Sequence, residues 1–406
     1  MKMIELLSPA GTMEKMKTAF HFGADAVYFA GKKFGLRAYA GNFDEKEMVE
    51  AIEYAHLLNK KAYITLNIIA HDDDFAGMKE YVEFLVKAKA DAVIVADIGV
   101  FAFVKRIAPS LEIHVSTQAN IINSESAILM VNLGAKRLIL ARELSLEEIK
   151  KIRASVPSDV EIECFVHGAM CISYSGRCLL SNYLTGRDSN RGACAQPCRW
   201  EYTITEKSRQ GDFFPIEQDE KGTYILNSKD LCMIAHLKDL VDAGVSSFKI
   251  EGRMKSEFYV GVVTNAYRKA LDNILVNKFT DELIKDLQIE LEKVSHRQFT
   301  TGFFYGANDK ECLESSMPVQ TTEFMAIVLE DKGNNKYLIE QRNRFACGEK
   351  LEIVSNGEAQ GREFEVKPMQ DEKGKEVLDA KNVQQKLVIE CPYKMQKMDM
   401  LRKKII

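Results

Sequence analysis

The larger, N-terminal part of the chain repeats one pattern, in which a short apolar segment is followed by a polar loop and an amphipathic segment with helical spacing. Apolar strands that alternate with helices are typical of a parallel sheet covered on both faces. We therefore predict a (β/α)8, TIM-barrel-like fold, with an open doubly wound sheet as the alternative. No GxGxxG motif follows the first segment, which argues against a dinucleotide-binding open sheet. The strands are expected within residues 4–11, 23–31, 60–68, 90–99, 111–121, 134–144, 159–168 and 245–252.

Helical spacing between these strands predicts helices that cover the sheet. In one of them Asp44 is the predicted N-cap, and Glu47 completes a capping box. The helices are expected within residues 12–23, 44–59, 78–89, 145–156 and 256–271.

The pattern changes near residue 305. From Met317 onward, short segments of alternating polarity are separated by Gly, Asn and Asp, which is typical of antiparallel strands. We predict a catalytic barrel domain over residues 1–305 and a small C-terminal antiparallel β-barrel domain over residues 317–400. A cysteine-rich segment at residues 164–232 and a hairpin at residues 200–226 are predicted insertions in the first domain.

The charge balance limits the class of protein. A net charge of −4 excludes a strongly basic nucleic-acid binder but leaves room for a local basic patch. The tail at residues 394–406, with five basic residues and one acid, is either such a patch or a solvated end helix or strand. No apolar run is long enough to span a bilayer and no secretory signal is evident, so we expect a cytoplasmic protein with no membrane partner.

Five of the nine cysteines crowd into one stretch of the sequence, a pattern that ordinary core packing does not require. Their spacing does not match the short knuckles of structural zinc sites, and disulfides are rare in the cytoplasm. An iron–sulfur cluster is favoured over these alternatives and over unrelated buried thiols. The five are Cys171, Cys178, Cys194, Cys198 and Cys232, whereas Cys164, Cys312, Cys347 and Cys391 are expected in the core.

Polar residues gather at the predicted carboxyl ends of the strands, where parallel barrels carry their active sites. In the segment HVSTQAN, strand alternation would place four polar side chains on one face, either for catalysis and binding or as a buried hydrogen-bond network. The catalytic candidates are His114, Gln118, Lys249, Glu251 and Arg253, and the substrate-binding candidates are Ser116, Asn120, Asn67 and Arg142.

Three further features have two interpretations each. Lys249, Glu251 and Arg253 are expected on one face, where they either bind an anionic small molecule or form a structural ion pair. Arg142 and Glu143 either bind an anion in the same way or form a structural pair, and the structural pair is favoured. His167 is either a buried histidine or a residue that tunes or binds the cluster.

Hydrolase motifs are missing from the sequence. There is neither an HExxH nor a GxSxG motif, so the usual zinc-protease helix and serine elbow are excluded. A nucleophilic pair of Cys171 and His167 stays open.

The stretch EIECFVHGAMCISYSGRCLLSNYLTGRDSNRGACAQPCRW closely resembles the signature of peptidase family U32. The segments LLSPAG, VYFAG, STQAN and KIEGR match other landmarks of that family in the same order, and the C-terminal β-domain resembles the family's own. The family name implies collagenase-like proteolysis, but its better-understood branches hydroxylate RNA or ubiquinone precursors without molecular oxygen.

The resemblance implies a specific activity. The branch with this domain architecture makes 5-hydroxyuridine at the tRNA wobble position with prephenate as co-substrate, and some branches carry a 4Fe-4S cluster. By position, Cys171, Cys178, Cys194 and Cys232 would hold that cluster, with Cys198 as an alternative ligand. The β-domain or the basic tail would present the RNA. A collagenase-like peptidase, and a non-catalytic iron–sulfur RNA-binding subunit that needs a homologous partner, are the other readings.

Overall fold

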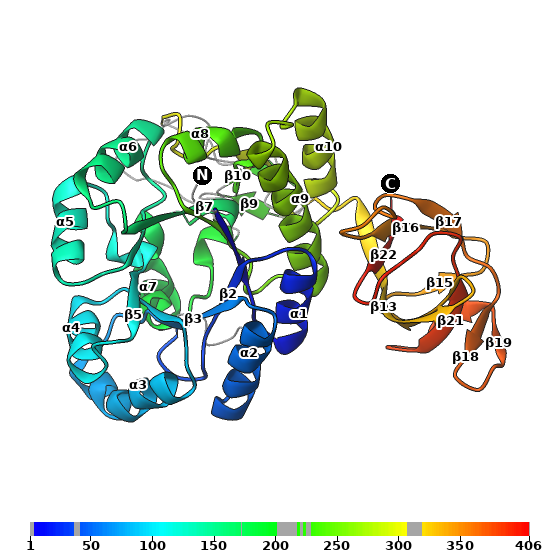
Figure 1. Cartoon of the computed structure of the whole chain (residues 1–406), viewed down its shortest axis with the longest axis horizontal. Coiled ribbons are helices and arrows are strands. Elements are labelled where there is room, and N and C mark those ends of the chain that lie inside the picture. Colours follow the sequence, from blue (N-terminus) through cyan, green and yellow to red (C-terminus); the bar gives the residue numbers. More distant parts are fainter. Residues whose placement is uncertain are drawn as a thin grey trace.

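In a computed structural model of the chain, eight parallel strands close into a barrel (Figure 1). The structure describes residues 4–35, 41–171, 173–200, 217–219, 222–224, 229–306 and 319–405. Each strand pairs with its neighbour in sequence from β1 to β7, and β11 closes the barrel by pairing with both β7 and β1. The barrel strands are β1 (Glu5–Pro9), β2 (Ala26–Phe29), β3 (Lys61–Leu66), β4 (Ala92–Val95), β5 (Glu112–Val115), β6 (Arg137–Ile139), β7 (Glu161–Ala169) and β11 (Ser247–Ile250).

A helix follows each barrel strand before the next one begins, so the predicted (β/α)8 order is confirmed. The capping box is also confirmed, because the Asp44 side chain accepts from the Glu47 amide and the Glu47 side chain accepts from the Asp44 amide. None of the helices in the described residues has the length and apolarity needed to cross a bilayer. The helices are α1 (Met13–His21), α2 (Glu45–Leu57), α3 (Met78–Lys87), α4 (Ile98–Ile107), α5 (Ser124–Asn132), α6 (Leu146–Ser155), α8 (Leu237–Asp242) and α9 (Glu257–Leu275).

The cysteine-rich segment lies between β7 and α8. Its described part consists of short turns around α7 (Leu180–Thr185), and it ends in β10 (Asp230–Cys232). Strand β10 runs antiparallel to the end of β7, and β12 (Phe299–Thr300) extends the sheet beside it. Of the predicted hairpin, the structure describes β8 (Glu217–Asp219) paired with β9 (Gly222–Tyr224), while its expected first strand at residues 201–206 lies outside the described residues.

The C-terminal part is all antiparallel, as predicted. Eight strands form one sheet in the order β17-β16-β22-β13-β14-β21-β18-β19, and β15 (Phe345–Ala346) pairs separately with β20 (Asp379–Ala380). The sheet strands are β13 (Thr322–Gly333), β14 (Lys336–Gln341), β16 (Lys350–Val354), β17 (Glu363–Glu365), β18 (Met369–Asp371), β19 (Glu376–Val377), β21 (Lys386–Glu390) and β22 (Met400–Lys404).

The end of the basic tail, Met400–Lys404, is a strand of the C-terminal sheet, which is one of the two structures expected from the sequence. It forms β22, which lies between β13 and β16 in the middle of the sheet. Arg402 is fully buried and binds Glu290, Lys403 pairs with Glu349 just before β16, and Lys404 pairs with Glu363 of β17. Cross-strand pairing therefore neutralises the basic side chains at the end of the tail.

The two parts of the chain share one continuous core. The rings of Phe258 on α9 and Phe324 on β13 stack with centroids 5.3 Å apart, and both belong to the barrel's apolar cluster. Asn265 of α9 donates a hydrogen bond to the Ser355 carbonyl oxygen over 2.9 Å. Burial of apolar area at this junction fixes the C-terminal sheet against the helix that follows β11.

A buried ion pair strengthens the same junction. Arg402 contacts Glu290 of α10 (Asp281–Leu291) over 2.6 Å and Glu352 of β16 over 2.5 Å. Burial alone would raise the pKa of the Glu290 carboxyl, but Arg402 and Lys293 outweigh it and lower this pKa to about 2. The charged form of Glu290 is therefore stabilised by folding.

Replacing Arg402 with Met should destabilise the protein, because two buried carboxylates lose their shared cation. We expect the free energy of unfolding at pH 7 to fall by about 3 kcal/mol in urea titrations. Glu290 has a folded-state pKa below its ordinary 4.5, so its contribution is present above 4.5 and is lost as the pH falls toward 2. The difference between variant and wild type should shrink over that range. Lys404→Met, which removes an exposed pair, is the control, and equal effects of the two variants would contradict the assignment.

Candidate active site at the carboxyl end of the barrel

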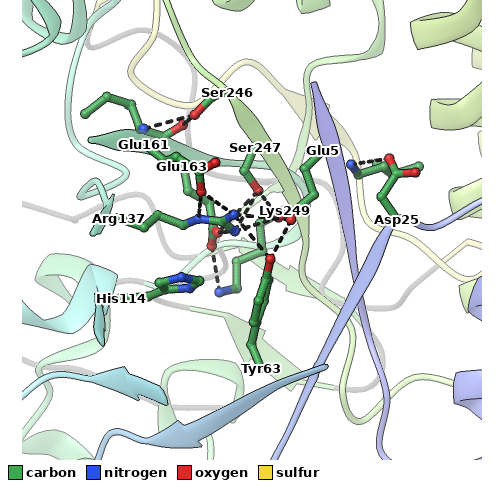
Figure 2. Close-up of polar contacts among 12 residues, drawn as sticks. Glu5, Asp25, Tyr63, His114, Arg137, Glu161, Glu163, Ser246, Ser247 and Lys249 are labelled. Atoms are coloured by element: carbon green, nitrogen blue, oxygen red, sulfur yellow. Dashed lines mark hydrogen bonds and ion pairs between the residues drawn. The ribbon is translucent and has the colours of Figure 1, made fainter. Parts of the chain in front are cut away.

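The barrel interior holds a cluster of buried charges around Arg137 (Figure 2). Its guanidinium lies 2.5 Å from Glu5, 2.8 Å from Glu163 and 2.5 Å from Glu161. Tyr63 and Ser247 complete the set: Arg137 donates to both hydroxyls, and each hydroxyl donates to Glu5. The cluster therefore joins strands β1, β3, β6, β7 and β11.

The sequence analysis missed this cluster. Arg137 and Glu163 lie inside strands that are otherwise nearly all apolar, and a charge there was the available signal. Only closure of the barrel brings their strands together with β1. A lone charge in an apolar strand could equally have marked a position that faces solvent.

Lys249 connects this cluster to the carboxyl end of the barrel, which we call the mouth. Its ammonium lies 2.8 Å from Glu163, 4.4 Å from the centre of the Tyr28 ring and 5.3 Å from that of Phe165. The side chain is only 3% exposed, so the cation sits between two aromatic faces in a poorly hydrated site. Lys249 therefore presents positive charge to the inner end of the mouth.

His114 lies in the same buried layer as Arg137 and Tyr63 (Figure 2). Its ring meets the edge of Tyr63 at 4.6 Å between centroids. Burial, together with the charges of Arg137 and Lys249, holds the pKa of His114 well below its ordinary value. The imidazole is therefore neutral, and its Nδ1 has no hydrogen-bond partner among the described residues.

The prediction that HVSTQAN is one extended strand is wrong. Strand β5 ends at Val115, and the Ser116 hydroxyl accepts from the Gln118 amide to start a 3-10 turn at Thr117–Ala119. Asn120 then adopts a left-handed conformation with φ of 56°. Strand alternation therefore stops at Val115, because β5 is only four residues long. For this reason His114, Ser116, Gln118 and Asn120 do not share a face.

One predicted substrate-binding residue, Asn67, meets one predicted catalytic residue, Gln118, at the mouth. The Asn67 amide, after β3, donates to the Gln118 side chain over 3.1 Å. The guanidinium of Arg142, after β6, donates to the Ala169 carbonyl oxygen and lies 5.4 Å from the centre of the Phe165 ring. The Arg142 Nε is buried and finds no acceptor in the part of the chain that the structure describes.

Arg142 and Glu143 do not form a pair with each other in the described contacts. Arg142 holds the end of β7, and Glu143 accepts hydrogen bonds from the amide and hydroxyl of Ser175. Together they anchor the cysteine-rich segment to the loop after β6.

The expected common face of Lys249, Glu251 and Arg253 is also wrong, because β11 ends at Ile250. Glu251 accepts from the Tyr28 hydroxyl over 3.4 Å, and Arg253 donates to the Asn42 side chain over 2.6 Å. Of the three, only Lys249 belongs to a barrel strand and joins the interior cluster.

The cysteines of the rich segment are not gathered at metal-binding distance. Within the described ranges, no group of three or more His, Cys, Asp or Glu side chains could hold a metal ion. Cys232 is half-buried, and the Tyr267 hydroxyl lies 3.9 Å from its sulfur. Burial raises the pKa of the Cys232 thiol to about 11. As placed, these side chains lie farther apart than the ligands of one cluster do.

The remaining histidine and cysteine predictions have mixed outcomes. His167 is a buried histidine, 3.3 Å from the Tyr267 hydroxyl, and burial, with the charges of His296 and Lys255, lowers its pKa to about 3. Cys164 and Cys391 are core residues as predicted, whereas Cys347 is exposed beside a turn and that prediction is wrong. Cys312 lies outside the described residues.

Arg137→Met should destabilise the barrel strongly, because Glu5, Glu161 and Glu163 would stay close together without their shared cation. We expect a loss of about 3–5 kcal/mol in the free energy of unfolding, measured by urea titration. The control is Arg344→Met, whose ion pair with Asp379 is exposed, and it should leave the unfolding midpoint unchanged. An unchanged midpoint for Arg137→Met would show that the charge cluster does not stabilise the barrel.

Comparison with known proteins supports the family predicted from the sequence. Residues 11–314 match the model of "Peptidase family U32", and residues 320–402 match "Peptidase family U32 C-terminal domain". The chain is 36% identical over 402 residues to "tRNA hydroxylation protein P1" of Bacillus subtilis (strain 168), covering 98% of this chain and 94% of that protein. It is 37% identical over 396 residues to "tRNA hydroxylation protein P" of Escherichia coli (strain K12), covering 86% of each. A "Collagenase" of Porphyromonas gingivalis (strain ATCC BAA-308 / W83) is 34% identical over 312 residues, covering 74% of this chain and 73% of that protein. The chain belongs to peptidase family U32.

Proposed function

We propose that this protein is an RNA hydroxylase that acts on tRNA. The observation that carries the proposal is the similarity to "tRNA hydroxylation protein P1", which spans 98% of this chain and includes both the barrel and the C-terminal sheet. The match to the relative named "Collagenase" covers a smaller share, 74% of the chain. Function resides in sites rather than folds, so the barrel mouth must also suit the reaction.

The geometry argues against a cysteine peptidase built on Cys171 and His167. A general base has to lie within hydrogen-bond reach of the nucleophile it activates. The Nδ1 of His167 instead meets the Tyr267 hydroxyl, and its ring packs against Tyr259 and Phe299. With its pKa lowered to about 3 by burial, this imidazole is a poor proton acceptor near neutral pH.

The mouth suits an anionic co-substrate together with a nucleobase. The Arg142 Nε is a buried donor without an acceptor among the described residues, and Lys249 supplies positive charge 5.3 Å from the same Phe165 ring that Arg142 covers. Carboxylates bind best where such donors are fixed in advance. At the rim, the amides of Asn67 and Gln118 offer both donors and acceptors for the edge of a base. We propose prephenate as the anion and a wobble uridine, converted to 5-hydroxyuridine, as the base.

In this proposal the protein binds and orients two reactants. Aromatic faces from Tyr28 and Phe165 flank the Lys249 ammonium and limit its hydration. In such a site an electrostatic contact is stronger than in water. Arg142 would hold the anion, while the Asn67–Gln118 pair would align the base beside it.

Mass analysis of tRNA nucleosides from a deletion strain tests the function. We expect 5-hydroxyuridine derivatives to be lost and then restored by the wild-type gene. In reconstituted reactions, Lys249→Met should lower the initial rate by about a hundred-fold, because it removes the buried cation at the mouth.

Lys332→Met is the matched control, since Lys332 makes an exposed pair with Glu330 in the C-terminal sheet, and it should react at the wild-type rate. Unchanged 5-hydroxyuridine in the deletion strain, with no second gene of the family present, contradicts the RNA assignment. If the Lys249→Met protein folds and keeps full activity, only the role proposed for Lys249 is contradicted, and the RNA assignment is unaffected.

The 4Fe-4S cluster is a separate proposal that depends on the sequence. Such a cluster takes four thiolates, and we propose Cys171, Cys178, Cys194 and Cys232, with Cys198 as the alternative ligand. Bound, it would supply electron transfer near the mouth. A cluster would require these thiols to come closer together than they lie in the described structure.

Protein purified without oxygen should contain about four iron and four sulfide per chain and should absorb visible light. Alanine at any one of the four proposed ligands should remove most of the iron. Cys347→Ala, at an exposed cysteine of the other domain, should retain it. Cys198→Ala decides whether that thiol is a ligand. A colourless wild-type protein that lacks iron and sulfide contradicts the proposal.

A further inference from the structure

One described stretch of the cysteine-rich segment, residues 173–200, lies against the loops at the carboxyl end of the barrel. The Asn190 carbonyl oxygen accepts from the Ile69 amide after β3, and Arg177 Nε donates to the Gln118 carbonyl oxygen after β5. Ser175 binds the loop after β6 through Glu143. This segment, which we call the mouth segment, therefore borders the candidate active site.

The mouth segment exposes large side chains that packing does not explain. Tyr183 is 86% exposed and Leu179 is 76% exposed, and the Tyr183 amide donates to the Leu179 carbonyl oxygen, which places both on one face of the first turn of α7. Tyr174, at 51% exposure, lies in the turn before it. A group of exposed aromatic and apolar side chains marks an interaction surface.

The charge of the mouth segment indicates the kind of partner. It contains four arginines and one aspartate, although the whole chain carries a net charge of −4. Arg177 uses only its Nε within the described structure, so its two terminal nitrogens have no acceptor there. Exposed aromatic rings beside basic groups suit single-stranded nucleic acid, whose bases stack on the rings while its phosphates meet the charges.

A cavity of about 360 Å³ lies between the mouth segment and the loops after β4 and β5. This volume falls within the usual range of small-ligand sites. Its wall is apolar at Ile98, Ala119 and Met130, and polar at Asp97 and Arg177. A nucleobase likewise has apolar and polar parts, because its flat faces are apolar and its edge is polar.

The polar groups of the cavity complement a pyrimidine. Asp97 uses Oδ1 to cap α4 through the Val100 amide, and its second oxygen accepts no hydrogen bond from the residues described. The carboxylate can accept from a base N–H, while the Arg177 nitrogens can donate to a base carbonyl. Across the described ranges these two side chains form no ion pair with each other, although both line the cavity.

We propose that the mouth segment docks unpaired nucleotides of an RNA, with one base stacked on Tyr183 and a pyrimidine seated between Asp97 and Arg177. This inference rests on the proposed function and adds the docking surface to it. It also explains why the exposed rings lie beside the barrel mouth: a target base has to leave its stack to reach the interior of a barrel.

Fluorescence anisotropy of the full chain with a labelled RNA stem–loop tests the surface. Tyr183→Ala should weaken binding by about ten-fold, and Tyr183→Phe should bind like the wild type because the ring is kept. Arg177→Gln should weaken binding by a similar factor and relax the preference for a pyrimidine at that position of the loop. Val383→Ala removes a side chain that is 91% exposed in a turn of the C-terminal domain, and it should have no effect.

Three results would overturn the inference. The first is wild-type binding by both Tyr183→Ala and Arg177→Gln. The second is equal affinity for the stem–loop and for a fully paired duplex of the same length. The third is unchanged RNA binding by Tyr183→Ala with weaker binding to denatured collagen, which would identify the face as a protein-docking surface.

The RNA-binding assay and the tRNA nucleoside analysis together separate this inference from the proposed function. If tRNA nucleosides of the deletion strain are unchanged but Tyr183→Ala loses RNA affinity, the docking surface stands and tRNA hydroxylation is wrong. If hydroxylation depends on the gene but both variants bind RNA normally, the function stands and the docking surface is wrong.

Discussion

The barrel depends on Arg137, a cation enclosed by carboxylates from strands that are far apart in the sequence. Glu5 lies in β1, and Glu161 and Glu163 lie in β7, so one guanidinium joins strands on both sides of the closure through β11. Parallel barrels are usually filled by layers of branched apolar side chains. A charge cluster tolerates fewer arrangements than such layers, because any misplaced strand leaves a buried charge without its partner.

The same cluster sets the chemistry of the mouth. Glu163 contacts Arg137 with one oxygen and Lys249 with the other, so the group that closes the barrel also positions the cation beneath the active site. Above it, Arg142 and Glu143 fix the cysteine-rich segment to the barrel. Glu163 therefore links the charge cluster to Lys249, the residue for which we propose a binding role at the mouth.

The sequence allowed the barrel, the antiparallel domain and the Asp44 capping box to be predicted, because each follows from local periodicity or from a short motif. It did not allow strand ends to be predicted, since HVSTQAN keeps an alternating pattern after Val115, where a serine cap turns the chain. It also did not reveal the partners of Arg137, which are set by barrel closure. The cysteine spacing did predict a shared site, but spacing along the chain says nothing of the distances between thiols, and the described structure leaves those thiols apart.

The contacts of the basic tail limit which of its side chains could bind RNA. Strand β22 inserts between β13 and β16, and its Arg402 is committed to Glu290 and Glu352 at the domain junction. A guanidinium held by two carboxylates has little charge left for a phosphate, and freeing it would expose a buried acid to an anion. Arg402 is therefore not available to bind a phosphate. In the described cysteine-rich segment Arg177 keeps two donors open toward a cavity, which suits the RNA docking proposed above. The C-terminal sheet also fixes α9 and α10 against the barrel.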